Sequence, residues 1–410
     1  MKHTPETFIP PRSKLAPLSL SISTFALLVA MWIVVPAAHT FLWLVAVGAS
    51  EWSLWFGALG LVGALLGLIP LKRGRSWQGI VAVVLGLLAV AFACYPPLVA
   101  HKVAKANDVH LSLSRYLLGS RIKQSASPQI FTFSTSGGQA LQLDFYAPAS
   151  EVAATMSSPS RPAIIVVHGG SWNGGARGDF PQWNRWLAAQ GYAVFDVDYR
   201  LAPQPNWQTA TSDVCCAVRW VKRHAPQLNI DAQRIALLGR SAGAHLALLA
   251  AYAHDDQSFV TTCPNSEDDD ALDHKVVADV QAVVAFYTPT DLRWAYDNPA
   301  NERVIDGPAT LRRFTGGTPQ TAPSIYDSAS PVTYVNSNAP PTLLIHGGRD
   351  QLVRRENMER LARVLDEANA PHESLLIPYA QHGFDYNFNG WGAQIVQPVM
   401  LRFLRAHLGS

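Results

Sequence analysis

Three long apolar stretches, separated by short polar breaks, occupy the first hundred residues. They run over about residues 18–48, 52–71 and 79–100. A helix needs about 20 apolar residues to cross the hydrocarbon core of a bilayer, whereas a secretory signal has an apolar core of only about 7 to 15. The pattern therefore predicts about three transmembrane helices. The first stretch contains Pro36 and His39, so it is either a kinked helix or a shorter helix with an interfacial end.

A different periodicity begins at about residue 128. The segments QIFTFST and LQLDFYAP alternate apolar and polar residues like the two strands of a hairpin, and Ser136-Gly137-Gly138 supplies the turn. Short continuous apolar runs follow, which favour strands covered on both faces, as in a parallel sheet. These runs are AIIVVHGG, AVFDVDY, RIALLG, VQAVVAFY and TLLIHGG.

Helix-like segments lie between these apolar runs, at about residues 179–190, 213–224, 241–254 and 356–368. Alternating strands and helices predict a doubly wound α/β domain. We therefore expect a membrane domain over residues 1–100, a linker over 101–128 and an α/β domain over 129–410. The segments 254–275 and 292–330 are longer than a simple crossover needs, so we expect loops or a partial lid there.

Charge adds an orientation to this picture. The net charge of +2 gives no reason to expect nucleic acid or an acidic partner. Cytoplasmic loops collect Lys and Arg, and such residues precede the first stretch and fill the break after the second: Lys2, Arg12, Lys14, Lys72, Arg73 and Arg75. Three crossings from an inside N-terminus carry the α/β domain out of the cytoplasm. If Pro36 splits the first stretch or leaves it re-entrant, the orientation reverses.

The cysteines and the acidic run predict no metal or redox site. A location outside the cytoplasm permits a disulfide, but Cys215, Cys216 and Cys263 leave one cysteine over. Cys215 and Cys216 are expected to be small buried helix residues, because nothing near them completes a ligand set. The acidic run over residues 266–270 lacks the spacing and glycine of a calcium loop, which favours a solvated loop.

A reactive serine is predicted where an apolar strand turns directly into a helix. Ser241 stands in GRSAG, with Gly239 and Gly243 on either side, between RIALLG and AHLALLAAY. The bare Gly-x-Ser-x-Gly pattern arises by chance, but its strand-turn-helix setting is that of a nucleophile on a strained turn. The small neighbours are needed because side chains would collide in so tight a bend.

A base and an acid for this serine are expected later in the chain. In a sheet of this type the order is Ser, then Asp or Glu, then His. Asp350 follows the strand TLLIHGG, and His382 follows SLLIPYAQ, so both fall at strand ends, where such sheets keep their sites. Asp291, after AFYTPT, also follows a strand and remains the alternative acid.

The segment VVHGGSWNGG supplies a candidate oxyanion hole. Its backbone N–H groups at Gly169 and Gly170 can point to the same place as the N–H of Ala242. A glycine-rich loop can instead bind phosphate, but the Gly-Lys-Ser/Thr ending is missing. His168 is expected to brace the loop, and Trp172 to form a wall beside the acyl group of a substrate.

Six motifs, in this order and spacing, resemble the α/β-hydrolase superfamily over about residues 129–408. They are HGGSW at 168–172, DYRLAP at 198–203, GRSAGAHLA at 239–247, ASP at 329–331, HGGRD at 346–350 and HGF at 382–384. The resemblance lies in the esterase and lipase branch, with hormone-sensitive-lipase-like, feruloyl and acetyl-xylan esterase-like and kynurenine-formamidase-like enzymes. Ser171 replaces a glycine of the HGGG pattern, which moves the likeness toward HGGxW carboxylesterases and formamidases. No role for Arg240 follows from the sequence.

The resemblance and the motifs together indicate a membrane-anchored serine hydrolase that acts on small-molecule or lipid esters without a cofactor or metal. Ser241 would attack, His382 would relay the proton and Asp350 would orient His382. An amidase, peptidase or acyl transferase could use the same residues, and a non-catalytic binding protein could keep the fold. The sequence leaves the oligomeric state and the identity of the ester open.

Overall fold

The computed structural model describes residues 14–72, 76–120, 127–136, 139–148, 160–260 and 276–409. The chain divides into two compact units, Met1–Val99 and Ala100–Ser410. Several residues singled out above lie outside the described residues: Lys2, Arg12, Arg73, Arg75, Gly137, Gly138, Cys263 and the acidic run 266–270.

Helices make up the described part of the N-terminal unit. They are α1 (Leu15–Ala30), continued by the 3-10 turn η1 (Met31–Ile33), then α2 (Thr40–Glu51), α3 (Ser53–Lys72) and α4 (Trp77–Ala106). Three helical segments, Leu15–Ile33, Ser53–Lys72 and Trp77–Ala106, are long and apolar enough to cross a membrane. The first apolar stretch is thus a long helix followed by the shorter α2. The break between them contains Pro36, which lacks the N–H that a continuous helix needs.

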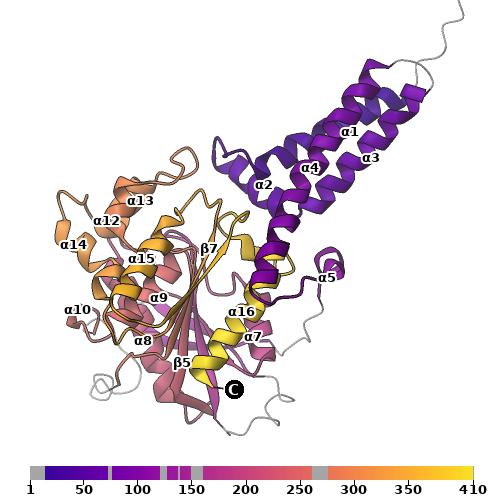
Figure 1. Ribbon diagram of the computed structural model, residues 1–410. Coiled ribbons are helices and arrows are strands. Elements are labelled where there is room, and N and C mark those ends of the chain that lie inside the picture. Colours follow the sequence, from indigo (N-terminus) through magenta and orange to yellow (C-terminus); the bar gives the residue numbers. More distant parts are fainter. Residues whose placement is uncertain are drawn as a thin grey trace, which may run out of the picture. The chain divides into compact units, whose positions relative to one another are not determined.

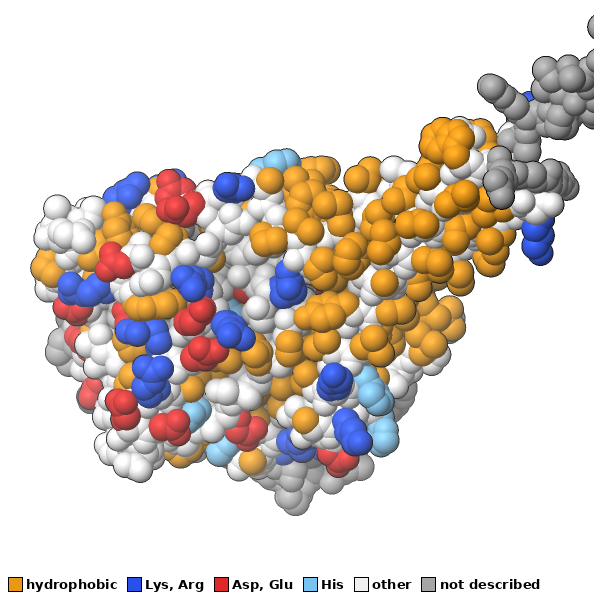
Figure 2. All heavy atoms as spheres, turned by 45° about the horizontal axis from the view of Figure 1, so that its top comes forward, with side chains coloured by type: hydrophobic (Ala, Val, Ile, Leu, Met, Phe, Trp, Pro, Cys, Tyr) orange, Lys and Arg blue, Asp and Glu red, His pale blue; other side chains and the backbone are white. Residues whose placement is uncertain are grey.

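Small residues line the contacts between the long helices. A Cβ atom added to Gly57 would lie 2.8 Å from the Cβ of Ala93, and one added to Gly60 would lie 2.8 Å from the Cβ of Ala89. Such close contact between backbones is typical of helices packed within a membrane. The large apolar side chains point outward instead (Figure 2), among them Leu18, Phe25, Leu28, Leu61, Leu65, Ile80, Val84 and Leu87.

An eight-stranded sheet is the centre of the C-terminal unit (Figure 1), with the order β1-β2-β4-β3-β5-β6-β7-β8. β1 pairs with β2, and β2 with β4, in antiparallel fashion, while the other pairs are parallel. The strands are β1 (Gln129–Ser136), β2 (Gln139–Tyr146), β3 (Arg161–Val167), β4 (Ala193–Val197), β5 (Ile230–Arg240), β6 (Ala282–Phe286), β7 (Thr342–Gly347) and β8 (His372–Ile377).

Helices cover both faces of this sheet, as continuous apolar strands require. α7 (Pro181–Ala189) and α16 (Trp391–Leu408) pack on one face, and α8 (Trp207–His224), α9 (Ala242–Tyr252) and α15 (Glu356–Glu367) pack on the other (Figure 1). Every residue of α9 is buried, which explains why this helix is apolar all round. A mostly parallel sheet between two helical layers agrees with the predicted α/β-hydrolase fold.

The long segments between strands hold short helices. α12 (Leu292–Asp297), α13 (Gly307–Thr315) and α14 (Pro323–Ser328) occupy the segment expected to be loops or a partial lid, and η2 (Pro331–Tyr334) follows them. α10 (Gln257–Val260) begins the other long segment. α8 starts at Trp207 rather than at Asp213, because its first turns, which look like loop in the sequence, are buried.

Part of the segment expected to be a linker is helical and bound to the C-terminal unit. α4 continues to Ala106, and α5 (Leu113–Leu118) follows. Arg115 Nη2 donates a 2.5 Å hydrogen bond to Gln397 Oε1. The ring of Tyr116 stacks on that of Trp391, with 4.3 Å between centroids. The segment before the sheet is thus fixed to the start of α16.

Candidate active site

Ser241 occupies a sharp turn between β5 and α9, with φ 53° and ψ −120°. A non-glycine residue rarely adopts this positive φ, so the turn is strained. A Cβ on Gly239 would lie 2.4 Å from the carbonyl oxygen of Gly243, and a Cβ on Gly243 would lie 2.2 Å from that of His168. Only glycine fits at these two positions, which explains the Gly-x-Ser-x-Gly pattern.

The structure brings Ser241, His382 and Asp350 together in one chain of hydrogen bonds. Nε2 of His382 lies 2.9 Å from Oγ of Ser241, and Nδ1 of His382 lies 2.7 Å from Oδ2 of Asp350. Because a carboxylate only accepts, Nδ1 carries the proton and Nε2 is left to accept from the serine hydroxyl. Asp350 follows β7 and His382 follows β8, so each reaches Ser241 from a strand end.

The Asp350 carboxylate is held on all sides. Its Oδ1 accepts from the backbone N–H groups of Leu352 at 2.8 Å and Val353 at 2.9 Å, and Nε2 of His346 lies 3.4 Å from its Oδ2. Burial raises the pKa of this carboxyl, but the charges and hydrogen bonds of His382 and His346 outweigh burial and hold the pKa well below its usual range. Asp350 is therefore ionised at neutral pH.

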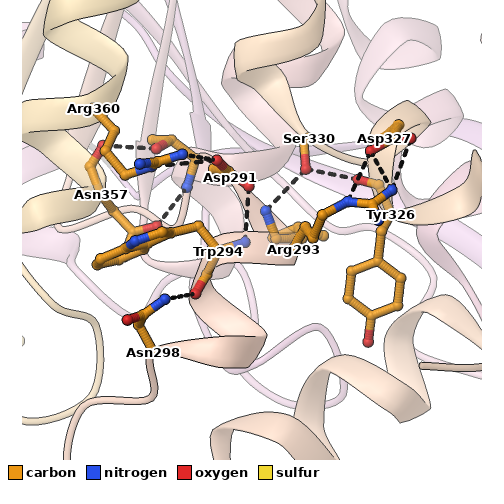
Figure 3. Close-up of polar contacts among 11 residues, drawn as sticks. Asp291, Arg293, Trp294, Asn298, Tyr326, Asp327, Ser330, Asn357 and Arg360 are labelled. Carbon is orange, nitrogen blue, oxygen red and sulfur yellow. Dashed lines mark hydrogen bonds and ion pairs between the residues drawn. The ribbon is translucent and has the colours of Figure 1, made fainter. Parts of the chain in front are cut away.

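Asp291, the alternative acid, is bonded to Trp294 and Arg360 instead (Figure 3). Its Oδ1 accepts from the backbone N–H of Trp294 at 2.9 Å, which caps α12. Its Oδ2 accepts from Nη2 of Arg360 at 2.5 Å. Both carboxylate oxygens are thus committed to a helix end and a cation, and neither is bonded to His382.

The glycine-rich loop after β3 lies against Ser241. A Cβ on Gly169 would lie 3.3 Å from the Cβ of Ser241, and Gly170 has φ 114°, a conformation that glycine adopts readily. Within the described part of the chain, the backbone N–H groups of Gly169, Gly170 and Ala242 have no acceptor. His168 stacks on Tyr199 at 4.3 Å, and its Nδ1 lies 2.7 Å from the carbonyl oxygen of Gly169.

Trp172 is almost fully buried beside the serine. Its ring stacks on Phe314 with 4.2 Å between centroids, and its Nε1 donates to Nδ1 of His245 at 3.2 Å. Nε2 of His245 donates to the carbonyl oxygen of Ala329 at 2.7 Å. Trp172 forms one wall of a mostly apolar pocket next to Ser241, lined also by Ser171, Ala242, Pro289, Ala295, Ile305, Leu311, Leu352 and Val353.

Several residues around the site are not found by sequence reasoning. His346, the second histidine on Asp350, lies in the HGGRD motif, and its position four residues before the aspartate was the available signal. The ring of Tyr287 packs on that of His382, Asp385 accepts a hydrogen bond from the hydroxyl of Tyr287, and neither residue carries a motif of its own. Among the described residues, no group of three or more His, Cys, Asp or Glu side chains could hold a metal ion.

A serine on a strand-to-helix turn, bonded to a histidine and an aspartate from later strand ends of a mostly parallel sheet, is the arrangement typical of an α/β-hydrolase. The BD-FAE family model matches residues 143–365, just over half of the chain, and the chain belongs to this family.

Similar proteins include two from Mycobacterium tuberculosis. Esterase LipC is 32% identical over 234 residues, which cover 56% of this chain and 55% of LipC. The probable carboxylic ester hydrolase LipM is 32% identical over 227 residues, covering 55% of this chain and 49% of LipM. The chain thus spans about half the length of these relatives. Each relative matches about the same share of this chain as the family model does.

A solved structure shares the fold. The thermophilic esterase Est2 of Thermogutta terrifontis superposes with a TM-score of 0.54 and 22% identity, covering 69% of this chain and 94% of Est2. This likeness supports the α/β-hydrolase fold of the C-terminal unit.

Proposed function

We propose that this protein is a membrane-anchored serine hydrolase that cleaves carboxylic esters through an acyl-enzyme. The observation that carries the proposal is the hydrogen-bonded chain from Ser241 through His382 to Asp350. A serine hydroxyl is a weak nucleophile until a base takes its proton, and a base keeps its acceptor nitrogen free only if another group fixes its tautomer. The chain of hydrogen bonds meets both needs.

The reaction has two halves. In the first, Oγ of Ser241 attacks the ester carbonyl carbon while Nε2 of His382 takes its proton, and His382 then gives this proton to the leaving alcohol. In the second, a water molecule loses a proton to His382 and attacks the acyl-enzyme, and Ser241 regains its proton as the carboxylic acid leaves. Asp350 stabilises the histidinium in both halves.

The oxyanion of each tetrahedral intermediate needs preorganised donors. The N–H groups of Gly169, Gly170 and Ala242, which have no acceptor among the described residues, are the donors we assign to it. Removing one such donor typically costs about 2.7 to 4 kcal/mol of transition-state stabilisation. The apolar pocket walled by Trp172 suits the acyl or alcohol part of a small-molecule or lipid ester.

Ser241→Ala tests the assignment. We expect turnover of a short-chain ester to fall by about six orders of magnitude, as happens when a triad nucleophile is removed. Ser324→Ala, at an exposed serine in α14, is the matched control and keeps wild-type turnover. Ester hydrolysis at the wild-type rate by Ser241→Ala would overturn the proposal.

We further propose that the catalytic unit lies outside the cytoplasm, anchored by three membrane spans. The three long apolar helices support the anchor. The position of Lys72 and its basic neighbours between the second and third spans supports an inside location for that loop. Cys216 is disulfide-bonded, whereas Cys94 and Cys215 are free. A disulfide is typical of oxidising compartments and so supports the outward orientation.

Protease and thiol labelling of intact cells test this orientation. We expect added protease to remove the catalytic unit, while a cysteine introduced by Gly74→Cys resists impermeant thiol reagents. The native free cysteines, Cys94 and Cys215, are replaced by serine in this variant so that they add no signal. Labelling of the new cysteine from outside, with the catalytic unit protected, would place the enzyme on the cytoplasmic side.

A further inference from the structure

Arg240, the residue before Ser241, is a buried cation with a defined partner. Its side chain is 2% exposed, and its Nε donates a 2.6 Å hydrogen bond to Oδ2 of Asp385, which is fully buried. Its guanidinium lies over the ring of Phe180 at 4.1 Å and over that of Phe286 at 4.9 Å. A charge is costly to bury, so an ion pair beside the nucleophile needs a reason.

The same carboxylate holds a tyrosine against the histidine of the site. Oδ1 of Asp385 accepts a 2.6 Å hydrogen bond from the hydroxyl of Tyr287. The ring of Tyr287 packs on that of His382, with 4.4 Å between centroids. Burial, and then the charge of Asp385, raise the pKa of Tyr287 well above its usual value. The hydroxyl therefore stays protonated and donates the hydrogen bond to Asp385.

The backbone ties this tyrosine to the nucleophile as well. Tyr287 has φ 39°, a conformation that an aromatic residue adopts only under constraint from its surroundings. Its N–H donates to the carbonyl oxygen of Ile345 at 2.7 Å, and the preceding residue, Phe286, accepts from the N–H of Ser241 at 2.9 Å. Strain at such a position is typical of functional sites.

We propose that Arg240, Asp385 and Tyr287 form a positioning network that holds His382 in line with Ser241. Asp350 fixes one edge of the imidazole through Nδ1, but a hydrogen bond at one atom still lets the ring swing about that bond. The Tyr287 ring blocks this motion from one face, and the buried ion pair keeps Tyr287 in place. This inference rests on the proposed function of Ser241 and His382 and explains the charged residue beside the serine.

Tyr287→Phe is the mildest test, because it keeps the ring and removes only the hydroxyl. We expect kcat, and the rate of reaction with a fluorophosphonate probe, to fall about tenfold to a hundredfold, because a small misplacement of a catalytic group has that cost. KM should not change. Tyr287→Leu, which also removes the ring, should lower kcat further. Asp385→Asn combined with Tyr287→Phe should cost less than the product of the two single effects.

Tyr252→Phe is the matched control. The hydroxyl of Tyr252 is also buried in the same unit and makes a 2.7 Å hydrogen bond to Thr342, away from the site. If the Tyr287 hydroxyl were merely structural, both variants would lose thermal stability and keep wild-type kcat, and the inference would be wrong. A rise in KM with unchanged kcat would also overturn it.

The experiments distinguish a failure of the positioning role from a failure of the proposed function. If Ser241→Ala is inactive and Tyr287→Phe behaves like Tyr252→Phe, only the positioning role is refuted. If Ser241→Ala hydrolyses esters at the wild-type rate, both the proposed function and the positioning role are refuted.

Discussion

Two neighbouring loops at the same edge of the sheet each present an aspartate, and the two residues differ in almost every physical respect. Asp291 follows β6 and Asp350 follows β7, so the fold gives them equivalent positions. The Asp350 side chain is fully buried, whereas that of Asp291 is 16% exposed and pairs with an arginine that is 36% exposed. The position at a strand end therefore does not decide which carboxylate serves the histidine.

The hydrogen-bond partners of each carboxylate oxygen determine which aspartate bonds to His382. Oδ1 of Asp350 accepts hydrogen bonds from two backbone N–H groups of its own loop. This orients the carboxylate so that Oδ2 faces His382. Oδ1 of Asp291 accepts a hydrogen bond from the first turn of α12, and Oδ2 accepts one from Arg360. Of the two aspartates, Asp350 is therefore the one whose own loop leaves a carboxylate oxygen available to His382.

Replacing the carboxylate of Asp350 should have the largest effect. In Asp350→Asn the amide group can donate to the histidine, which favours the wrong tautomer and leaves Nε2 protonated. We expect kcat to fall about 10⁴-fold while the fold is kept. Steady-state kinetics with a soluble ester, together with circular dichroism, checks both parts. Activity near that of the wild type would remove Asp350 from the mechanism.

His245 is a second buried histidine near the site, and its surroundings differ from those of His382. Within the part of the chain that the structure describes, its ring bonds only to uncharged groups, Trp172 and the carbonyl of Ala329. Burial lowers its pKa to about 4, and the hydrogen bond to Ala329 opposes this only in part. His245 therefore stays neutral in the folded protein at neutral pH.

The sign of the pH effect follows from this lowered pKa. Between pH 6.5 and 4 the unfolded chain binds a proton at His245 that the folded chain does not, so the free energy of unfolding falls as the pH drops through this range. The stability that depends on neutral His245, about 3 kcal/mol, is present in full above pH 6.5 and is lost by about pH 4. Denaturant unfolding of wild type and His245→Gln at several pH values measures it. An equal pH dependence in both proteins would contradict the assignment.

Asp291→Asn should have the smallest effect. Asparagine is as good an N-cap as aspartate, so the variant loses only the ion pair with Arg360. A partly exposed pair contributes up to about 1 kcal/mol, so we expect a small drop in thermal stability and turnover close to that of the wild type. If Asp291→Asn cost more turnover than Asp350→Asn, the acid would be Asp291.

Much of this arrangement could be predicted from the sequence because it depends on local patterns. The strand-turn-helix setting of Ser241 and the strand ends before Asp350 and His382 are visible in short windows of residues. The mostly parallel sheet follows from its continuous apolar runs, and the structure agrees with that prediction. The six motifs place the chain in the esterase and lipase branch, which the family match confirms.

The remainder depends on contacts between distant segments. Arg240 and Asp385 are 145 residues apart, and no local pattern shows that the fold buries them together. The helices α12, α13 and α14 are only six to nine residues long and depend on tertiary contacts, so the sequence indicates only a long insertion there. The early start of α8 at Trp207 has the same cause, because burial overrides its loop-like composition.

We propose that Ser241 is a nucleophile activated by His382 and Asp350. The most direct measurement is peptide mass spectrometry of the full-length protein after reaction with a fluorophosphonate probe, run in parallel on Asp350→Asn and Ser241→Ala. We predict one adduct, on the peptide that carries Ser241, formed far more slowly in Asp350→Asn and absent from Ser241→Ala. An adduct on another serine, or equal labelling of Ser241→Ala, would contradict the account.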